Sequence, residues 1–467
     1  MMPNRFKLLL ALLLPLLVLN LPAELLPLPD ASLVEQRLLA IFLLAALLWV
    51  LEPVPVFATS LLIIGLLLIT VSDQAAVWFL REDAGQPLGE LLPYQAIMGS
   101  FASPIIILFL GGFALALGAA KYKLDTNLAN YLLRPFMASH DRLMLGIMLI
   151  TALFSMFMSN TATTLMMLTI MGPVFASLGL QAPSTRGLLL AIPIAANLGG
   201  IGTPIGTPPN AIALQYMANP IDFLTWMAFA VPLVLVMLVA AWRLLLRLYP
   251  AAELGLCLTL SSKFVRSPRA YLLYATFALT IVLWLTSFWH GMNSYVVAVI
   301  PLVVFSLTGI ITPADLQKIN WDVLWLVAGG IALGLALDQS GLARKLALSL
   351  PLEQLPGAAI LLSLLLVCFL LANIMSNTAT ANLILPITAA VATGYQGMAD
   401  YGLDSALVLV ALSCSLGMIL PVSTPPNALA YATGLITTRD MLRTGLAVGA
   451  FGLALLFVIL LVLGALG

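Results

Sequence analysis

Charged residues are scarce in this chain: only 8% of its 467 residues are Asp, Glu, Lys or Arg, against about a quarter in a typical soluble domain. The mean hydropathy is +1.11, and 62% of the residues are hydrophobic. Such a chain does not fold as an ordinary soluble domain, so we expect a polytopic membrane protein. The formal charge of zero says nothing about partners. We expect the protein to contact a lipid bilayer and no nucleic acid.

Histidine and cysteine are also rare. The two histidines, His140 and His290, stand at the ends of apolar runs, which leaves no cluster for a metal or a proton relay. The three cysteines, Cys257, Cys368 and Cys414, lack the spacing of a metal or redox site, and we interpret them as packing residues. An intramembrane enzyme would need a nucleophile and base or a metal cluster among the apolar residues, so we do not expect an enzyme.

What the chain has instead is repetition. Three short patterns each occur twice, in the same order. The copies of Met-Ser-Asn-Thr-Ala-Thr and of Thr-Pro-Pro-Asn-Ala lie 217 residues apart, and those of Gly-Gly-x-Ala-Leu-x-Leu lie 218 apart. They begin at Met158 and Met375, at Thr207 and Thr424, and at Gly111 and Gly329. We therefore predict an internal duplication, with a transporter's substrate site between the two copies.

The apolar runs divide the chain into four parts. Residues 1–36 hold a run from Leu8 to Leu21, which is short for a span of about 20 residues and could belong to a signal peptide. No small-residue cleavage site follows it, so we predict an N-terminal transmembrane helix and loop. Residues 37–249 form the first repeat, 250–268 a cytoplasmic linker and 269–467 the second repeat.

Both repeats follow one plan of five crossings and a broken apolar pair. In the first we predict helices near 37–51, 54–72, 103–120 and 224–249, an amphipathic stretch near 123–138, a pair broken at Ser159, and a run over 187–219 interrupted from Gly199 to Asn210. In the second we predict helices near 269–289, 293–310, 321–338 and 440–466, an amphipathic piece near 341–350, a pair broken at Ser376, and a run near 404–437 interrupted from Pro421 to Asn427.

The distribution of lysine and arginine indicates the topology. If each broken pair turns back within the membrane, each repeat has an odd number of crossings and the repeats are inverted. With the N-terminus in the cytoplasm, only Arg37, Arg81, Arg344 and Lys345 of the 19 basic residues lie outside, as the positive-inside rule requires. The predicted fold is thus an all-α polytopic membrane protein with about 11 transmembrane helices. It has two inverted repeats of five helices, each with a re-entrant hairpin and an unwound helix, and lies in a bacterial inner membrane.

The four breaks indicate the chemistry. Non-helical backbone at mid-membrane depth is tolerated only where it is buried in protein or lines a cavity. Paired interrupted segments in two halves point to a transporter's binding site. Freed carbonyls with Asn, Ser and Thr oxygens are hard, neutral ligands that suit sodium. None of the breaks carries a carboxylate, Lys or His, which favours sodium coupling over proton coupling.

The same breaks create helix N-termini, which attract anions through free N–H groups and partial positive charge. Proline favours the first turn of a helix, and Pro208 and Pro425 stand where each interrupted run restarts. Threonine hydroxyls at Thr161, Thr207, Thr378 and Thr424 could add donors. Ser, Asn and Thr also merely bridge neighbouring helices in many membrane proteins, but their repetition at both tips and both interrupted runs favours a binding site.

At these residues the sequence resembles the divalent anion:sodium symporter family of sodium-coupled dicarboxylate and citrate transporters. The resemblance implies one sodium at Ser155, Ser159, Asn160 and Gly206, and a second at Ala372, Met375, Asn377 and Ser423. It implies substrate contacts from Asn160, Thr161, Asn377, Thr378, Thr207, Thr424 and Pro425. It also implies a homodimer, with a fixed scaffold domain and a transport domain that moves like an elevator, each drawn from both repeats. Ser423 departs from the family, where alanine is expected.

We expect from these features a sodium-coupled importer of C4-dicarboxylates such as succinate, malate and fumarate, with at least two sodium ions transported per cycle. A sodium-independent dicarboxylate exchanger and a sodium-coupled citrate or sulfate transporter would use the same kind of anion site. A channel would need a continuous polar pore, whereas broken helices that meet at mid-depth favour an occluded site.

Overall fold

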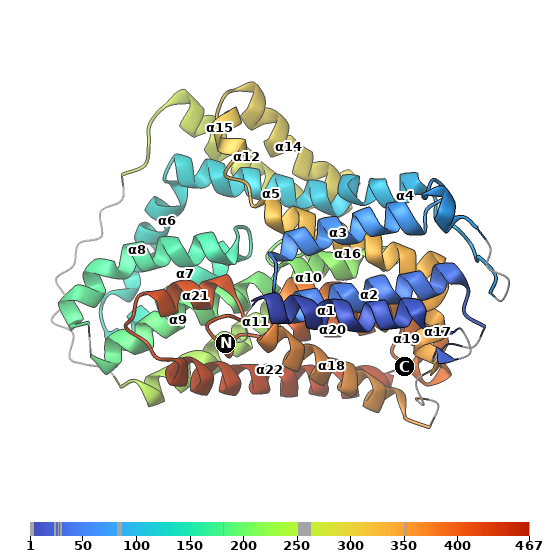
Figure 1. Cartoon of the computed structure of the whole chain (residues 1–467). Coiled ribbons are helices and arrows are strands. Elements are labelled where there is room, and N and C mark those ends of the chain that lie inside the picture. The colour runs from blue at the N-terminus through green and yellow to red at the C-terminus, as the bar shows by residue number, and fades with distance from the viewer. Residues whose placement is uncertain are drawn as a thin grey trace.

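The computed structural model describes residues 4–22, 25, 26, 28, 30–81, 86–180, 182–250, 263–349, 352 and 354–466. In these ranges every regular element is a helix, apart from an isolated bridge between Ser72 and Leu92 (Figure 1). Nine helices of the described residues are long and apolar enough to cross a membrane, and three shorter ones are apolar too. The all-α polytopic fold is therefore confirmed.

Eleven α-helices precede the described part of the linker. Residues next to the helix starts determine where some of these helices begin. Ser32 and Glu35 form a capping box that starts the second helix, and Ser103 caps the fifth. The bounds are α1 Asn4–Asn20, α2 Leu33–Leu51, α3 Val56–Thr70, α4 Tyr94–Gly99, α5 Pro104–Lys121, α6 Leu124–Leu133, α7 His140–Ser155, α8 Asn160–Leu178, α9 Pro183–Ile201, α10 Pro208–Gln215 and α11 Phe223–Leu248.

Eleven more follow, after residues 251–262 of the predicted linker, which lie outside the described residues. The bounds are α12 Pro268–Leu285, α13 Ser287–His290, α14 Ser294–Leu307, α15 Pro313–Leu316, α16 Trp321–Gln339, α17 Leu342–Ser349, α18 Gly357–Ile374, α19 Asn377–Gly394, α20 Leu403–Ser415, α21 Pro425–Ala432 and α22 Thr438–Leu466. In the described part of the chain, four short 3₁₀ helices lie in the connections: Val77–Phe79, Ser100–Ala102, Arg134–Phe136 and Gln396–Met398.

Some predicted boundaries are wrong. The first interruption, expected from Gly199 to Asn210, spans only residues 202–207, since α9 continues to Ile201 and α10 begins at Pro208. The helix expected near 269–289 ends at Leu285, because Thr286 leaves the helical conformation, and the separate turn α13 follows. The second interrupted run unwinds from Leu416, before Pro421. At this point its backbone packs closely against Ala372. A Cβ built on Gly417 would lie 2.6 Å from the carbonyl oxygen of Ala372, so glycine permits this approach.

The two halves cross over one another at their broken helices. We name α7–α8 the first hairpin, α18–α19 the second hairpin, α9–α10 the first broken helix and α20–α21 the second broken helix. Each first segment packs on its own hairpin: α9 on α7 and α8, and α20 on α18 and α19. Each second segment packs on the other half instead, α10 on α19 and α20, and α21 on α8 and α9 (Figure 1). The buried core is centred here, and 17 of the 19 residues of α9 are buried.

The other helices pack around this centre. Helix α3 contacts α2 and α16, and α14 contacts α5 and α12. The Gly-Gly pairs permit close approach: a Cβ on Gly111 would lie 2.3 Å from the Ala298 carbonyl oxygen of α14, and one on Gly329 would lie 2.4 Å from the Ser60 Cβ of α3. The hairpins lie toward opposite ends of the molecule in Figure 1, α8 at the left and α19 at the right.

Candidate functional site

Both hairpins break at the predicted tips, and a serine caps the returning helix in each. The Ser159 hydroxyl accepts a hydrogen bond from the Ala162 N–H at 3.2 Å, and the Ser376 hydroxyl accepts one from the Ala379 N–H at 3.2 Å. The serines therefore serve their own helix starts. The N–H groups of Asn160 and Thr161, and of Asn377 and Thr378, have no intrahelical partner, because they lie in the first turn.

The asparagine of each Thr-Pro-Pro-Asn motif ties its broken helix together. The Asn210 amide donates to the carbonyl oxygens of Gly200, Ile201 and Thr203 at 3.2, 3.2 and 2.8 Å. In the other half, the Asn427 amide donates to the carbonyl oxygens of Met418 and Leu420 at 2.8 and 3.0 Å. These side chains satisfy carbonyls that unwinding frees. Sequence reasoning missed this role, although the asparagine follows Pro-Pro in both copies.

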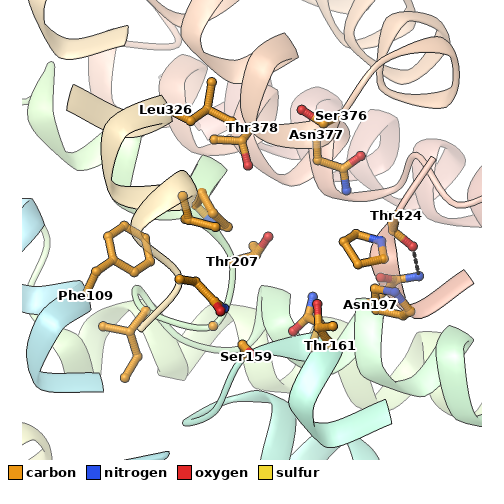
Figure 2. A pocket seen from close by; sticks show the side chains of 18 of the residues that line it. Phe109, Ser159, Thr161, Asn197, Thr207, Leu326, Ser376, Asn377, Thr378 and Thr424 are labelled. Atoms are coloured by element: carbon orange, nitrogen blue, oxygen red, sulfur yellow. Dashed lines mark hydrogen bonds between the residues drawn. The ribbon is translucent and has the colours of Figure 1, made fainter. Parts of the chain in front are cut away.

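The four breaks surround one cavity of about 220 Å³, which we call the central cavity. Figure 2 shows Ser159 and Thr161 on one side of it, Ser376, Asn377 and Thr378 on the other, and Thr207 between them. All seven residues predicted to contact substrate line this cavity: Asn160, Thr161, Thr207, Asn377, Thr378, Thr424 and Pro425. Phe109 of α5 and Leu326 of α16 add apolar walls.

Oxygen atoms converge around Asn160. Its amide nitrogen donates to the Ser155 hydroxyl at 2.5 Å, to the Gly206 carbonyl oxygen at 3.2 Å and to that of Ala196 at 3.3 Å. Ser155 is buried and also bonds to the Ala196 carbonyl at 2.7 Å. Of the four residues predicted for the first sodium, three are therefore in contact. The Ser159 hydroxyl caps α8 instead, and the Ala196 carbonyl joins unexpectedly.

A second, sparser convergence surrounds Asn377. Its amide nitrogen donates to the carbonyl oxygens of both Cys414 and Gly417 at 3.3 Å, and Gly417 packs on Ala372. Met375 is buried beside the tip. The Ser423 hydroxyl accepts from the Leu420 N–H of its own loop and donates to the Asn373 carbonyl of α18, both at 3.1 Å.

Sequence reasoning missed three polar residues that line the central cavity, Asn197, Asn320 and Asp322. Asn197 of α9 is buried and donates to the Thr424 hydroxyl and to the Asn427 side-chain oxygen, both at 3.1 Å (Figure 2). Asp322 stands in the first turn of α16 and is the one charged residue among the described residues that line the cavity. Asn197 was detectable as a lone amide just before Gly199, whereas nothing in the sequence brings Asp322 to the breaks.

Two further cavities adjoin the central one. The basic side cavity, of about 510 Å³, shares Ser159 and Asn320 with it and contains Lys123 and Lys318. Burial raises the pKa of Asp125, which also lines this cavity. The acidic side cavity, of about 760 Å³, shares Asp322 and Thr424 with the central cavity and contains Glu52.

A small cavity at the meeting point of two hairpins and two broken helices, within a bundle of membrane-length helices, defines a membrane transport protein. No group of three His, Cys, Asp or Glu in the described ranges is placed to hold a metal. The cavity instead offers hydroxyls, amides, freed carbonyls and helix N-termini.

Comparison with known proteins identifies the family. A family model described as "Citrate transporter" matches residues 46–412. The chain is 31% identical over 449 residues to the sodium-dependent dicarboxylate transporter SdcS of Staphylococcus aureus strain NCTC 8325, a match that covers 87% of this chain and 82% of the relative. The SdcS protein of the bovine strain RF122 is 30% identical over the same shares. The chain therefore belongs to this family of citrate and sodium-dependent dicarboxylate transporters, as the sequence resemblance indicated.

Solved structures show the same type of fold at low sequence identity. The YdaH transporter of Alcanivorax borkumensis aligns with a TM-score of 0.55 at 14% identity, covering 88% of this chain and 98% of that one. MtrF of Neisseria gonorrhoeae, described as one of a class of antimetabolite efflux pumps, aligns with a TM-score of 0.53 at 14% identity, covering 87% and 94%. These matches support a transporter fold.

Proposed function

We propose that the protein is a sodium-coupled importer of C4-dicarboxylates, namely succinate, malate and fumarate. The observation that carries the proposal is the charge of the central cavity. Among its described lining residues there is no Lys, Arg or His, and the one charged residue, Asp322, is acidic. A dianion held there needs positive charge from solution, and the oxygens around Asn160 and Asn377 are suited to bring sodium to both sides of it.

The substrate carboxylates would take their hydrogen bonds from the helix starts. Thr161 and Thr378 follow the two capping serines, and Thr207 and Thr424 precede the helices that begin with Pro-Pro. Free N–H groups and the partial positive charge at such ends favour anions. Bound sodium would offset the substrate's charge, which couples the two binding events. Each sodium that moves down a tenfold gradient releases about 1.4 kcal/mol, so two would support roughly hundredfold accumulation of a neutral complex.

Alternating access by an elevator-type movement suits this architecture. The moving domain would contain both hairpins and both broken helices, which pack on one another. The fixed domain would contain α5 and α16, whose Phe109 and Leu326 face the cavity, and would form the contacts of a homodimer. The predicted inverted repeats, the cytoplasmic N-terminus and the location in a bacterial inner membrane belong to this proposal.

Uptake of labelled succinate into liposomes that contain the purified protein tests the function. We expect uptake with an inward sodium gradient and none with potassium or choline. Equal uptake in all three, increased by succinate inside the liposomes, would replace symport with sodium-independent exchange. Uptake of citrate or sulfate but not succinate would keep the anion site and change the substrate.

A further inference from the structure

Asp322 is placed to act on the charge of whatever anion occupies the central cavity. Its side chain is exposed in the first turn of α16, and it lines both the central cavity and the acidic side cavity. In the described part of the chain it has no ion-pair partner, and the other ionisable group of the acidic side cavity, Glu52, is also acidic.

The fold alone does not require a carboxylate at this position. The Gly-Gly patterns of α5 and α16 are 218 residues apart, and the same offset matches Asp322 with Pro104. Pro104 opens α5 behind the capping residue Ser103, so a helix of this kind starts without an acid. An acid in a first turn is favoured by the helix dipole, which is the simplest structural explanation. That explanation does not account for its exposure to a cavity built for an anion.

We propose that Asp322 is a charge-selecting residue, which weakens anion binding in the central cavity in proportion to the charge of the anion. The proposal rests on the proposed function of this cavity. Coulomb repulsion from one fixed charge scales with the charge of the ligand, so a trianion is disfavoured more than a dianion, and a dianion more than a monoanion. Asp322 thereby favours C4-dicarboxylates over tricarboxylates of similar chemistry.

The dependence of the repulsion on ligand charge gives a test. A purely structural role of Asp322 would not make the effect of its removal depend on the charge of the ligand. Dissociation constants would be measured by calorimetry at saturating sodium and pH 8 for succinamate, succinate and citrate, which carry one, two and three charges. We expect Asp322→Asn to tighten succinate binding about tenfold, a magnitude typical of one charge acting across a solvated cavity. On a logarithmic scale, the gain for succinamate should be about half the gain for succinate, and the gain for citrate about one and a half times the gain for succinate. Each comparison is made within one ligand, so differences in ligand size cancel.

Three variants complete the design. Asp322→Glu should keep the wild-type constants, and Asp338→Asn, near the other end of α16, should change none of them. Asp322→Ser is the second neutral variant, should Asp322→Asn fail to fold. Equal gains for all three ligands, or no gain in folded protein, would overturn the proposal. Absence of binding of every ligand to the wild-type protein would instead refute the proposed function.

Discussion

Asn197 of the first half donates a hydrogen bond to the Thr424 hydroxyl of the second half, 227 residues later, at 3.1 Å. Both side chains are buried, and Thr424 opens α21, which packs on α9. The start of the second segment of one broken helix is thus fixed by the other half of the chain. This contact places Thr424 at the central cavity and shows why neither half forms the site alone.

The amides at the hairpin tips should control the response to sodium. We expect Asn160→Ala and Asn377→Ala each to raise the sodium concentration for half-maximal uptake by about tenfold or more, because each removes the amide that holds in place the carbonyl oxygens predicted to bind sodium. Initial rates of succinate uptake against sodium concentration provide the measurement. Asn20→Ala, on an exposed helix end, is the matched control. Unchanged sodium dependence in both tip variants would eliminate the two ion sites.

The asparagines that tie the broken helices should matter for stability more than for affinity. Asn427→Ala leaves the carbonyl oxygens of Met418 and Leu420 without their partner, and Asn210→Ala does the same in the first half. We expect each to cost about 2–4 kcal/mol, since each strips two or more buried hydrogen bonds. Thermal unfolding in detergent measures the loss, with Asn293→Ala, an exposed cap, as the control. Wild-type melting of both variants would show that the breaks hold without them.

Close packing of α16 on the second hairpin depends on Gly330. A Cβ at this position would lie 2.0 Å from the Asn382 side chain, which donates to the Leu326 carbonyl at 2.9 Å. We expect Gly330→Ala to displace Asn382 and to lower both melting temperature and uptake. Gly172→Ala, in a helix with open space around it, should be neutral or stabilising by up to about 1 kcal/mol. A Gly330→Ala protein as stable and active as the Gly172→Ala protein would disprove the steric argument.

The ion pair between Lys121 and Asp315 predicts a pH dependence of stability. The Lys121 ammonium, 2.5 Å from the carboxylate, and the Thr312 hydroxyl hold the pKa of Asp315 well below its usual range. A lowered pKa stabilises the folded protein above the unfolded-state pKa of about 4, and this stability is lost as the pH falls toward the folded-state value.

We therefore expect Lys121→Met to melt a few degrees lower than wild type from pH 5 to pH 8, with the difference shrinking below about pH 4. Melting temperatures in detergent across this range are the measurement, and Lys123→Met is the control. A difference that grows on acidification would have the wrong sign for this pair.

The sequence predicted the parts of the structure that local chemistry determines. Apolar runs located the helices, and Ser-Asn-Thr and Pro-Pro located the breaks, because capping and proline act within a few residues. The seven residues predicted to contact substrate line the cavity for the same reason. The crossing of α10 and α21 onto opposite halves, the bridge from Asn197 and the position of Asp322 depend on contacts between distant segments, which no local pattern encodes.

The central claim is that cations from solution make the cavity an anion site, and equilibrium binding of succinate to the purified protein tests it most directly. Dissociation constants would be compared in sodium and in potassium at equal ionic strength and pH. We predict binding in sodium and at least about hundredfold weaker binding in potassium, since two nearby positive charges would be missing from a site that supplies none. Equal affinity in the two salts would contradict the account.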